Sequence, residues 1–217
     1  MPMLSVGGKI KGIVNIIYDV HTLKESGRYL IAKISTIDYN LIVAMTHSDS
    51  KLYSKNNRQA ANLRQFHEAI SMEQETHKCE NVLAIGDFNA NPFEDSCLGA
   101  DNLFAQPFAD EVISSPTRDV GEKTYQKFYN PTWKFFGNRT APFTTYHYVD
   151  SGDMANCHWN VLDQVIIRPQ LIKAFDDEQL KIISSTKNHQ LLRNGKPDSK
   201  NYSDHLPLFC VLKEELI

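Results

Sequence analysis

The spacing of apolar and polar positions predicts strands in the first part of the chain. Three runs are rich in β-branched and aromatic residues, and the short polar sequences ESG and IDYN separate them. Runs bounded by turn residues in this way are typical of strands, and short turns join antiparallel neighbours. We expect an antiparallel meander formed by residues 12–20, 28–36 and 39–47.

The period of the apolar positions changes over residues 56–77. Apolar residues there recur at helical spacing, with charged residues on the remaining faces, which is typical of an amphipathic helix. The apolar stripe consists of Leu63, Phe66 and Ile70. Asn56 is placed to cap the first turn. A buried strand is predicted at 81–88 and a short helix after Pro92, so we expect a mixed α and β fold class.

The second half of the chain has weaker periodicity. From about 106 to 158, prolines are interleaved with aromatic residues, and a connection of that length is usually functional or disordered. We expect the aromatic run from Tyr125 to Phe136 to pack this connection. Later strands, with a polar loop before the last, are predicted at 159–169, 179–186 and 206–214.

Composition narrows the class of protein. The 217 residues are 41% hydrophobic, enough for a sizeable core, and we expect residues 1–217 to form a single domain. The formal net charge of −3 gives no global basic field, so nucleic-acid binding would depend on a local patch. We find no apolar run of ~20 residues, no signal-peptide core and no CxxC pair among the cysteines. We therefore expect a cytoplasmic protein with reduced cysteines.

Several predicted strands carry polar residues at one end. The strand VLAIG runs into Asp87 and Asn89, the strand LIVAMTH ends in His47, and SDH places Asp204 and His205 just before the last strand. A turn is the plain explanation for Gly, Asp and Asn after a strand. The other explanation is the edge of an active site.

Asp163 lies within the apolar run NVLDQVII, where a carboxylate is costly to bury unless it is paired or hydrogen-bonded. If these strands lie in facing sheets, the polar groups converge. A carboxylate can then deprotonate water or hold Mg²⁺, and an imidazole can donate to phosphoryl oxygens or to the leaving group. If they do not converge, Asp163 is a structural carboxylate and His47 a hydrogen-bonded histidine at a strand end.

The same residues carry a resemblance to a known family. The motifs TH at 46–47, GDFNANP at 86–92, LDQVI at 162–166 and SDHLP at 203–207 resemble those of the DNase-I-like endonuclease/exonuclease/phosphatase superfamily, in the same order. The resemblance covers roughly residues 10–214. It implies a two-sheet α/β sandwich, α+β in type, and a metal-dependent phosphoester hydrolase.

The resemblance implies a role for each matching residue. Asp87 resembles the acid that orients or activates the attacking water, and Asn89 the amide that holds a phosphate oxygen. His47 resembles a histidine that in some branches helps to protonate the leaving oxygen. Arg58 lies in the region of a family motif written RxxQ, although the order here is RQAANL.

The remaining matches complete the implied site. His205 resembles the histidine that contacts the scissile phosphate, and Asp163 the aspartate that orients this imidazole by accepting a hydrogen bond. Asp204 resembles a carboxylate at or near the metal. The implied cofactor is Mg²⁺ or Mn²⁺.

One part of the family pattern is not found. The family begins with a strand carrying an asparagine, then a helix, then a strand ending in a metal-binding glutamate, and no glutamate before GDFN ends an apolar strand here. We therefore expect a fold that is incomplete at its N-terminus, with sheet edges that an oligomer would cover. A cation held by Asp204 and few other carboxylates would bind weakly, so we expect feeble hydrolysis.

The substrate stays open among three hypotheses. A nuclease acting on phosphodiesters is the leading one, because the aromatic connection and the lysines near SDH, which are Lys187, Lys196 and Lys200, can meet a phosphate backbone. The second is a phosphodiesterase or phosphatase acting on a small phosphorylated molecule or a lipid headgroup. The third is a non-catalytic module that binds a partner through its sheet edges.

Overall fold

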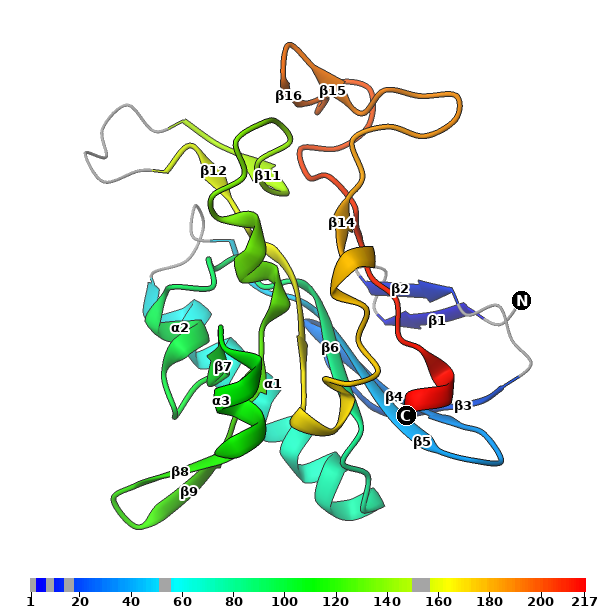
Figure 1. Ribbon diagram of the computed structural model, residues 1–217, viewed down its shortest axis with the longest axis vertical. Coiled ribbons are helices and arrows are strands. Elements are labelled where there is room, and N and C mark those ends of the chain that lie inside the picture. Colours follow the sequence, from blue (N-terminus) through cyan, green and yellow to red (C-terminus); the bar gives the residue numbers. More distant parts are fainter. Residues whose placement is uncertain (1–2, 7–9, 14–17, 51–55, 150–156) are drawn as a thin grey trace.

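A mixed sheet forms the centre of the molecule (Figure 1). The computed structural model describes residues 3–6, 10–13, 18–50, 56–149 and 157–217. Within these ranges the largest sheet has seven strands, in the order β3-β4-β5-β6-β13-β10-β7. They are β3 (Asp19–Glu25), β4 (Tyr29–Ser35), β5 (Asn40–His47), β6 (Val82–Asp87), β7 (Ala105–Gln106), β10 (Phe128–Tyr129) and β13 (Asp163–Ile167).

Short ladders and helices complete the regular structure, and the mixed α and β class is confirmed. The two-stranded ladders are β1 (Met3–Val6) with β2 (Ile10–Ile13), β8 (Thr117–Val120) with β9 (Lys123–Gln126), β11 (Tyr146–His147) with β12 (Trp159–Asn160), β14 (Lys181–Ile182) with β17 (Leu208–Phe209), and β15 (Leu192–Arg193) with β16 (Lys196–Pro197). The α-helices are α1 (Asn56–His77), α2 (Asp95–Leu98) and α3 (Ala109–Ser114). The 3-10 helices are η1 (Pro131–Phe135), η2 (Pro169–Leu171), η3 (Asp177–Gln179) and η4 (Glu214–Leu216).

The expected antiparallel meander is present as β3-β4-β5. Strands β4 and β5 match the predictions, but the described parts of the strand predicted at 12–20 belong to two strands, the end of β2 and the start of β3. Strand β3 begins at Asp19 and runs to Glu25, while 14–17 lies outside the described residues. As the edge strand of the sheet, β3 has one neighbour and keeps polar side chains half exposed, so it lacks the apolar signal of a central strand.

Helix α1 covers one face of the sheet over the predicted range. Its stripe of Leu63, Phe66 and Ile70 is at most 1% exposed and packs on Ala84 of β6. Asn56, predicted as the cap, is the first helical residue, and its side chain lies outside the described residues. Hydrophobic burial along this stripe therefore holds the helix on the sheet.

The opposite face of the sheet is covered by the C-terminal part of the chain. Alternate residues of β6 point to opposite sides, so that Val82 faces the core under α1 and Leu83 faces a second core. Ile182 of β14 and Leu208 of β17 pack on this second core. Strand β6 is thus buried on both faces, as its apolar run predicts.

The second sheet of the predicted sandwich is much reduced. Among the described residues its regular pairing is the short ladder β14–β17, whereas strands were predicted over 179–186 and 206–214. Single backbone bonds extend the pairing, from Ile183 N–H to the Pro207 carbonyl and from Asp176 N–H to the Val211 carbonyl, at 2.9 and 3.0 Å. Apolar residues of both runs pack on the second core, although few of them form ladder bonds.

The connection from 106 to 158 is built from short elements rather than one loop. It contains α3, the hairpin β8–β9, β10, η1 and β11. Phe128 and Phe135 are 0% and 5% exposed and belong to the cores on the two faces of the sheet. The aromatic run therefore packs the connection, as expected. The strand predicted at 159–169 is divided into β12 and β13.

The cysteines and helices agree with the sequence analysis. All four cysteines are free thiols. Cys79 and Cys97 are buried in the core under α1. Within the described ranges, no helix combines the length and the apolar character needed to cross a membrane.

Candidate active site

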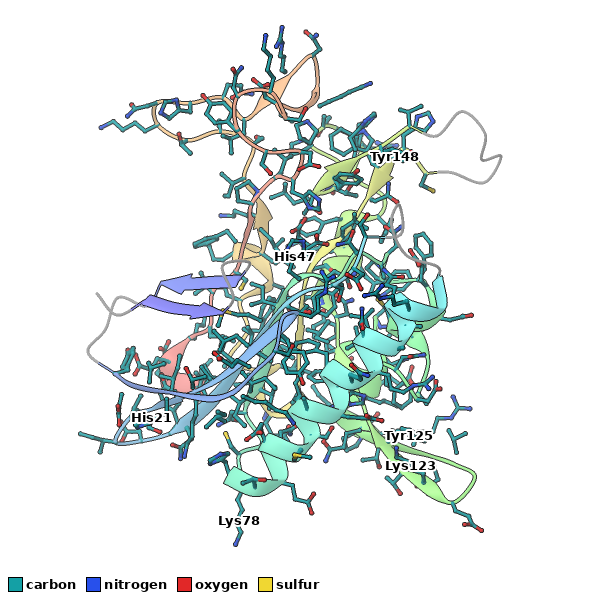
Figure 2. The ribbon with its side chains drawn as sticks, turned by 180° about the vertical axis from the view of Figure 1, so that it is seen from behind. His21, His47, Lys78, Lys123, Tyr125 and Tyr148 are labelled. Atoms are coloured by element: carbon teal, nitrogen blue, oxygen red, sulfur yellow. The ribbon has the colours of Figure 1, made fainter. Side chains whose placement is uncertain are left out.

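Three neighbouring strands meet at one edge of the central sheet, and each carries a predicted site residue there. Strands β5 and β6 are parallel, so His47 and Asp87 pair at their C-terminal ends. Strand β13 is antiparallel to β6 and begins with Asp163, which pairs with Asp87. The register therefore places the three residues in one row, and His47 marks this edge in Figure 2.

Gly86 lets β5 and β6 approach closely just before this row. Its φ is +144°, which L side chains rarely adopt, and a Cβ atom there would lie 2.0 Å from the carbonyl oxygen of Thr46. A larger residue would push apart the strands that carry His47 and Asp87. The backbone therefore requires the glycine of GDFN.

His205 joins the row from the C-terminal segment. Its Nδ1 lies 2.7 Å from Asp163 Oδ2, the hydrogen bond that the resemblance implies. One potential ligand atom from each of Asp87, Asp163 and His205 lies within 4.8 Å of the other two. A backbone bridge and a ring contact with Tyr146, with centroids 4.7 Å apart, hold the imidazole in place. Because Nδ1 is engaged, Nε2 is the nitrogen that can meet a substrate.

The cluster raises the pKa values of two of its members. Burial, and then the charge of Asp163, raise the pKa of Asp87 from 3.8 to about 6, against the opposing effects of His205 and the Asn89 N–H. Burial lowers the pKa of His205, but the hydrogen bond and charge of Asp163, with the charges of Asp87 and Asp204, raise it to about 8. Near neutral pH an ionised Asp87 therefore lies beside a protonated imidazole.

Asn89 follows Asp87 in a left-handed turn with a φ of +50°, which asparagine tolerates better than most residues. Its backbone N–H and its Nδ2 donate to the two Asp87 carboxylate oxygens, each at 2.8 Å, and Nδ2 also donates to the Ser48 carbonyl at 2.9 Å. In this arrangement Asn89 positions the Asp87 carboxylate. Its contact with a phosphate oxygen stays a prediction.

The other predicted residues lie around the cluster. His47 Nε2 is 3.7 Å from Asp87 Oδ2, and the His47 side chain is 49% exposed. Asp204 is exposed and, in the described ranges, does not belong to the group whose ligand atoms converge. Its charge nevertheless raises the pKa of Asp87. Arg58 is turned to another carboxylate, with Nε 3.2 Å from Asp49 Oδ2.

The sequence analysis missed the side chains that hold the loop after Asp87. Gln59 of α1 donates from Nε2 to the carbonyl oxygens of Phe88 and Asn89, and Gln164 of β13 donates to that of Ala90. Both glutamines are at most 2% exposed. For Gln164 a signal existed, because a polar side chain inside the apolar run LDQVI must find partners when it is buried.

Asn91 ties the same loop to β12 and to the residue after it, just before the strand that carries Asp163. Its Oδ1 accepts from the Val161 N–H at 2.9 Å, and its Nδ2 donates to Asn160 Oδ1 at 2.8 Å. The loop is thus fixed from the helix on one side and from β12–β13 on the other. This bracing limits the movement of the Asp87 carboxylate.

The donor set suits a divalent cation in part. Carboxylate oxygens are the ligands that Mg²⁺ prefers, and Mn²⁺ also accepts an imidazole nitrogen. The cluster offers two carboxylates, and its imidazole can serve as a ligand only when deprotonated, so it supplies fewer donors than the near-octahedral shell that Mg²⁺ demands. Water or phosphate oxygens would have to complete that shell.

A scan against protein-family models finds no match, and a search of curated proteins finds none either. Solved structures do match. An endonuclease/exonuclease/phosphatase family protein from Bacteroides thetaiotaomicron is 14% identical, with a TM-score of 0.44 over 84% of this chain and 54% of that chain. The 3′ phosphatase NExo from Neisseria is 14% identical, with a TM-score of 0.44 over 89% and 70%. The endonuclease domain of TRAS1, a telomere-specific non-LTR retrotransposon, is 11% identical, with a TM-score of 0.49 over 97% and 77%.

The chain resembles endonuclease/exonuclease/phosphatase structures. The chain spans 54% of the length of the Bacteroides thetaiotaomicron protein.

Proposed function

We propose that this protein is a DNase-I-like, divalent-metal-dependent phosphoester hydrolase that acts on the phosphodiesters of nucleic acid. The observation that carries the proposal is the convergence of Asp87, Asp163 and His205 within 4.8 Å. A strand-end turn does not require two carboxylates and an imidazole from a distant segment to meet. Like charges at such spacing are unfavourable, and groups arranged in this way are typical of functional sites.

The proposed mechanism assigns a role in proton transfer or hydrogen bonding to each of three side chains, Asp87, His205 and His47. Asp87, held by Asn89, accepts a proton from the attacking water. His205, oriented by Asp163, donates from Nε2 to a phosphoryl oxygen and neutralises charge that develops in the transition state. His47, on the other side of Asp87, donates a proton to the leaving oxygen.

The proposed cofactor is Mg²⁺ or Mn²⁺. Asp204, to which the resemblance gives this role, and Asp163 are the carboxylates that would hold it. Such a cation supplies neutralisation of the charge on the phosphoryl oxygens. With so few carboxylates, we expect weak cation binding and slow hydrolysis.

Nucleic acid is the substrate we favour because cations gather on a hairpin that contacts β11, the strand bridged to His205. Arg193, Lys196 and Lys200 line a pocket of about 410 Å³ in the segment before His205. Lysine and arginine side chains so placed can contact successive phosphates. A small phosphorylated molecule or a lipid headgroup, the alternative substrates, would use fewer of them.

The test is hydrolysis of bis(4-nitrophenyl) phosphate and of a single-stranded oligonucleotide, with Mg²⁺, with Mn²⁺ and with EDTA. We expect cation-dependent hydrolysis that falls about 100-fold or more in His205→Ala and in Asp87→Ala. His21→Ala is the matched control, since His21 also lies 2.8 Å from an aspartate, Asp19, but is exposed on the edge strand (Figure 2). Equal rates in all four proteins, or rates unaffected by EDTA, would refute the proposal.

A further inference from the structure

An aromatic hairpin lies directly beside the candidate active site. We use this name for residues 143–149 and 157–160, which contain β11 and β12. Tyr146 forms an antiparallel bridge with His205, with ring centroids 4.7 Å apart. The Leu206 N–H donates to the Thr145 carbonyl at 2.8 Å. The hairpin is therefore fastened to the segment that positions the imidazole.

The rings of this hairpin contact one another. Trp159 meets the His147 ring at 5.0 Å and the Phe143 ring at 5.6 Å, both edge to face. Tyr146 and Tyr148 are stacked, with centroids 6.4 Å apart and planes at 11°. All five side chains are intermediate in exposure rather than buried. Partly exposed rings in such an array offer faces on which nucleobases stack.

A basic hairpin lies against the aromatic hairpin. We use this name for residues 192–200, which contain β15 and β16. Strand β11 contacts β16, and burial together with the charge of Lys196 lowers the pKa of His147, so this cation is close to the rings. Three cations, Arg193, Lys196 and Lys200, and one carboxylate, Asp198, line the pocket of this hairpin, which leaves it net positive. Figure 1 shows both hairpins at one end of the molecule and β8–β9 at the opposite end.

We propose that the aromatic and basic hairpins form a subsite for single-stranded nucleic acid, in which an unpaired base stacks on the rings and its neighbouring phosphates meet the cations. This inference rests on the proposed function, because the subsite adjoins His205 and would present the scissile phosphate to it. The base must leave its own stack to reach the rings. The subsite therefore selects single strands, loops or frayed ends over intact duplex.

The charge beside the rings decides between two kinds of ligand. Aromatic surfaces also bind quaternary ammonium groups, such as a choline headgroup, through cation–π attraction. Lys196 belongs to β16, which contacts β11, so its charge repels such a cation at the rings and attracts phosphate. The surroundings of the rings therefore fit a nucleotide better than a choline headgroup.

The experiment measures binding of a short fluorescent single-stranded DNA by anisotropy, in EDTA so that no turnover occurs. The variants are Tyr148→Ala and Lys196→Gln. Their matched controls are Tyr125→Ala and Lys123→Gln in the β8–β9 hairpin, where Lys123 also lies over a tyrosine ring, 4.8 Å from its centroid. Figure 2 labels Tyr148 near one end of the molecule, and Lys123 and Tyr125 near the other.

We expect about tenfold weaker binding in each of the two variants and unchanged binding in both controls. Equal affinity in all variants, tighter binding to duplex than to single strand, or binding to phosphatidylcholine vesicles that Tyr148→Ala abolishes would each overturn the subsite. Melting temperatures identify a variant that fails to fold, and Tyr148→Phe, which keeps a ring, should then retain the affinity. Diester hydrolysis by the unaltered protein is measured in parallel. Its absence alongside hairpin-dependent binding would refute the proposed function and leave the subsite standing.

Discussion

At the scale of single residues, the fold holds two like-charged carboxylates closer together than they would lie if both were free in water. Asp87 and Asp163 face each other across the β6–β13 ladder, and the proton on His205 offsets their repulsion. The same arrangement raises the pKa of Asp87 to about 6, so that this carboxylate can act as a base near neutral pH. It also raises the pKa of His205 to about 8, so that the imidazole can donate a proton there. The repulsion that destabilises the site and the pKa shifts that the proposed chemistry needs therefore come from the same close packing of charges.

The pH dependence of hydrolysis follows from these two groups. Activity requires ionised Asp87, so it rises as pH increases through about 6. It also requires protonated His205, so it falls as pH increases through about 8. We expect a bell-shaped profile of kcat/KM with its maximum near pH 7. Asp163→Asn should move the alkaline limb to lower pH, because the imidazole loses its charged acceptor. An alkaline limb that Asp163→Asn leaves in place would contradict this assignment.

Gln59 is expected to matter as a positioning residue. Gln59→Ala removes the donor that holds two loop carbonyls after Asp87, leaving them buried without that partner. We expect kcat to fall about tenfold while the pH profile stays unchanged. Gln65→Ala, an exposed glutamine on the same helix, serves as the control and should retain full activity. A shifted pH profile in Gln59→Ala would argue against a purely positioning role.

His47, Asp87 and Asn89 could be predicted from the sequence because they end or follow apolar strands, and Asp163 because a carboxylate is conspicuous within an apolar run. Gln59 was missed because a glutamine on an amphipathic helix is usually exposed, and only the folded loop supplies its partners. The role of Asn89 also depends on contacts that spacing does not reveal. Geometry within a loop is set by hydrogen bonds between residues far apart in sequence.

At the scale of elements, the accuracy of the prediction depended on the periodicity of the apolar residues and on the number of strands that pair with each strand. Helix α1 was predicted over its full range because a long amphipathic repeat is unambiguous. The central strands β4, β5 and β6 were also predicted, because burial demands apolar runs. The edge strand β3 was misplaced and the strand containing β17 was predicted too long, since the extent of both depends on which neighbours they pair with.

A prediction about Gly86 follows from the close approach of β5 and β6. Gly86→Ala places a methyl group against the Thr46 carbonyl at a positive φ, and we expect it to lower the free energy of unfolding by about 3 kcal/mol. Gly27→Ala is the control, because nothing lies within 4 Å of the added Cβ atom there and its φ is not positive. Urea denaturation compares the two variants. A Gly86→Ala protein as stable as Gly27→Ala would show that the strands can separate at little cost.

At the scale of the whole molecule, function would depend on what is gathered at one end. The strand-end row, the aromatic hairpin and the basic hairpin come from segments spread from His47 to His205. The motif order predicted the row, but the contact between the two hairpins depends on the tertiary fold.

The gathering of cations predicts a salt effect on substrate affinity. We expect KM for an oligonucleotide to rise steeply with salt concentration, by more than about tenfold between low and physiological ionic strength, because phosphate contacts release counterions. The KM for bis(4-nitrophenyl) phosphate, which carries a single phosphate, should change far less. Equal salt dependence for both substrates would favour a small phosphorylated molecule or a headgroup over nucleic acid.

The measurement that tests the central claim most directly is a double-mutant cycle on hydrolysis with Asp87→Ala, His205→Ala and the two combined. If these side chains act as one catalytic unit around one phosphorus atom, each single variant loses about as much kcat as the double variant does. Losses that multiply in the double variant, or single variants as active as the unaltered protein, would contradict the account.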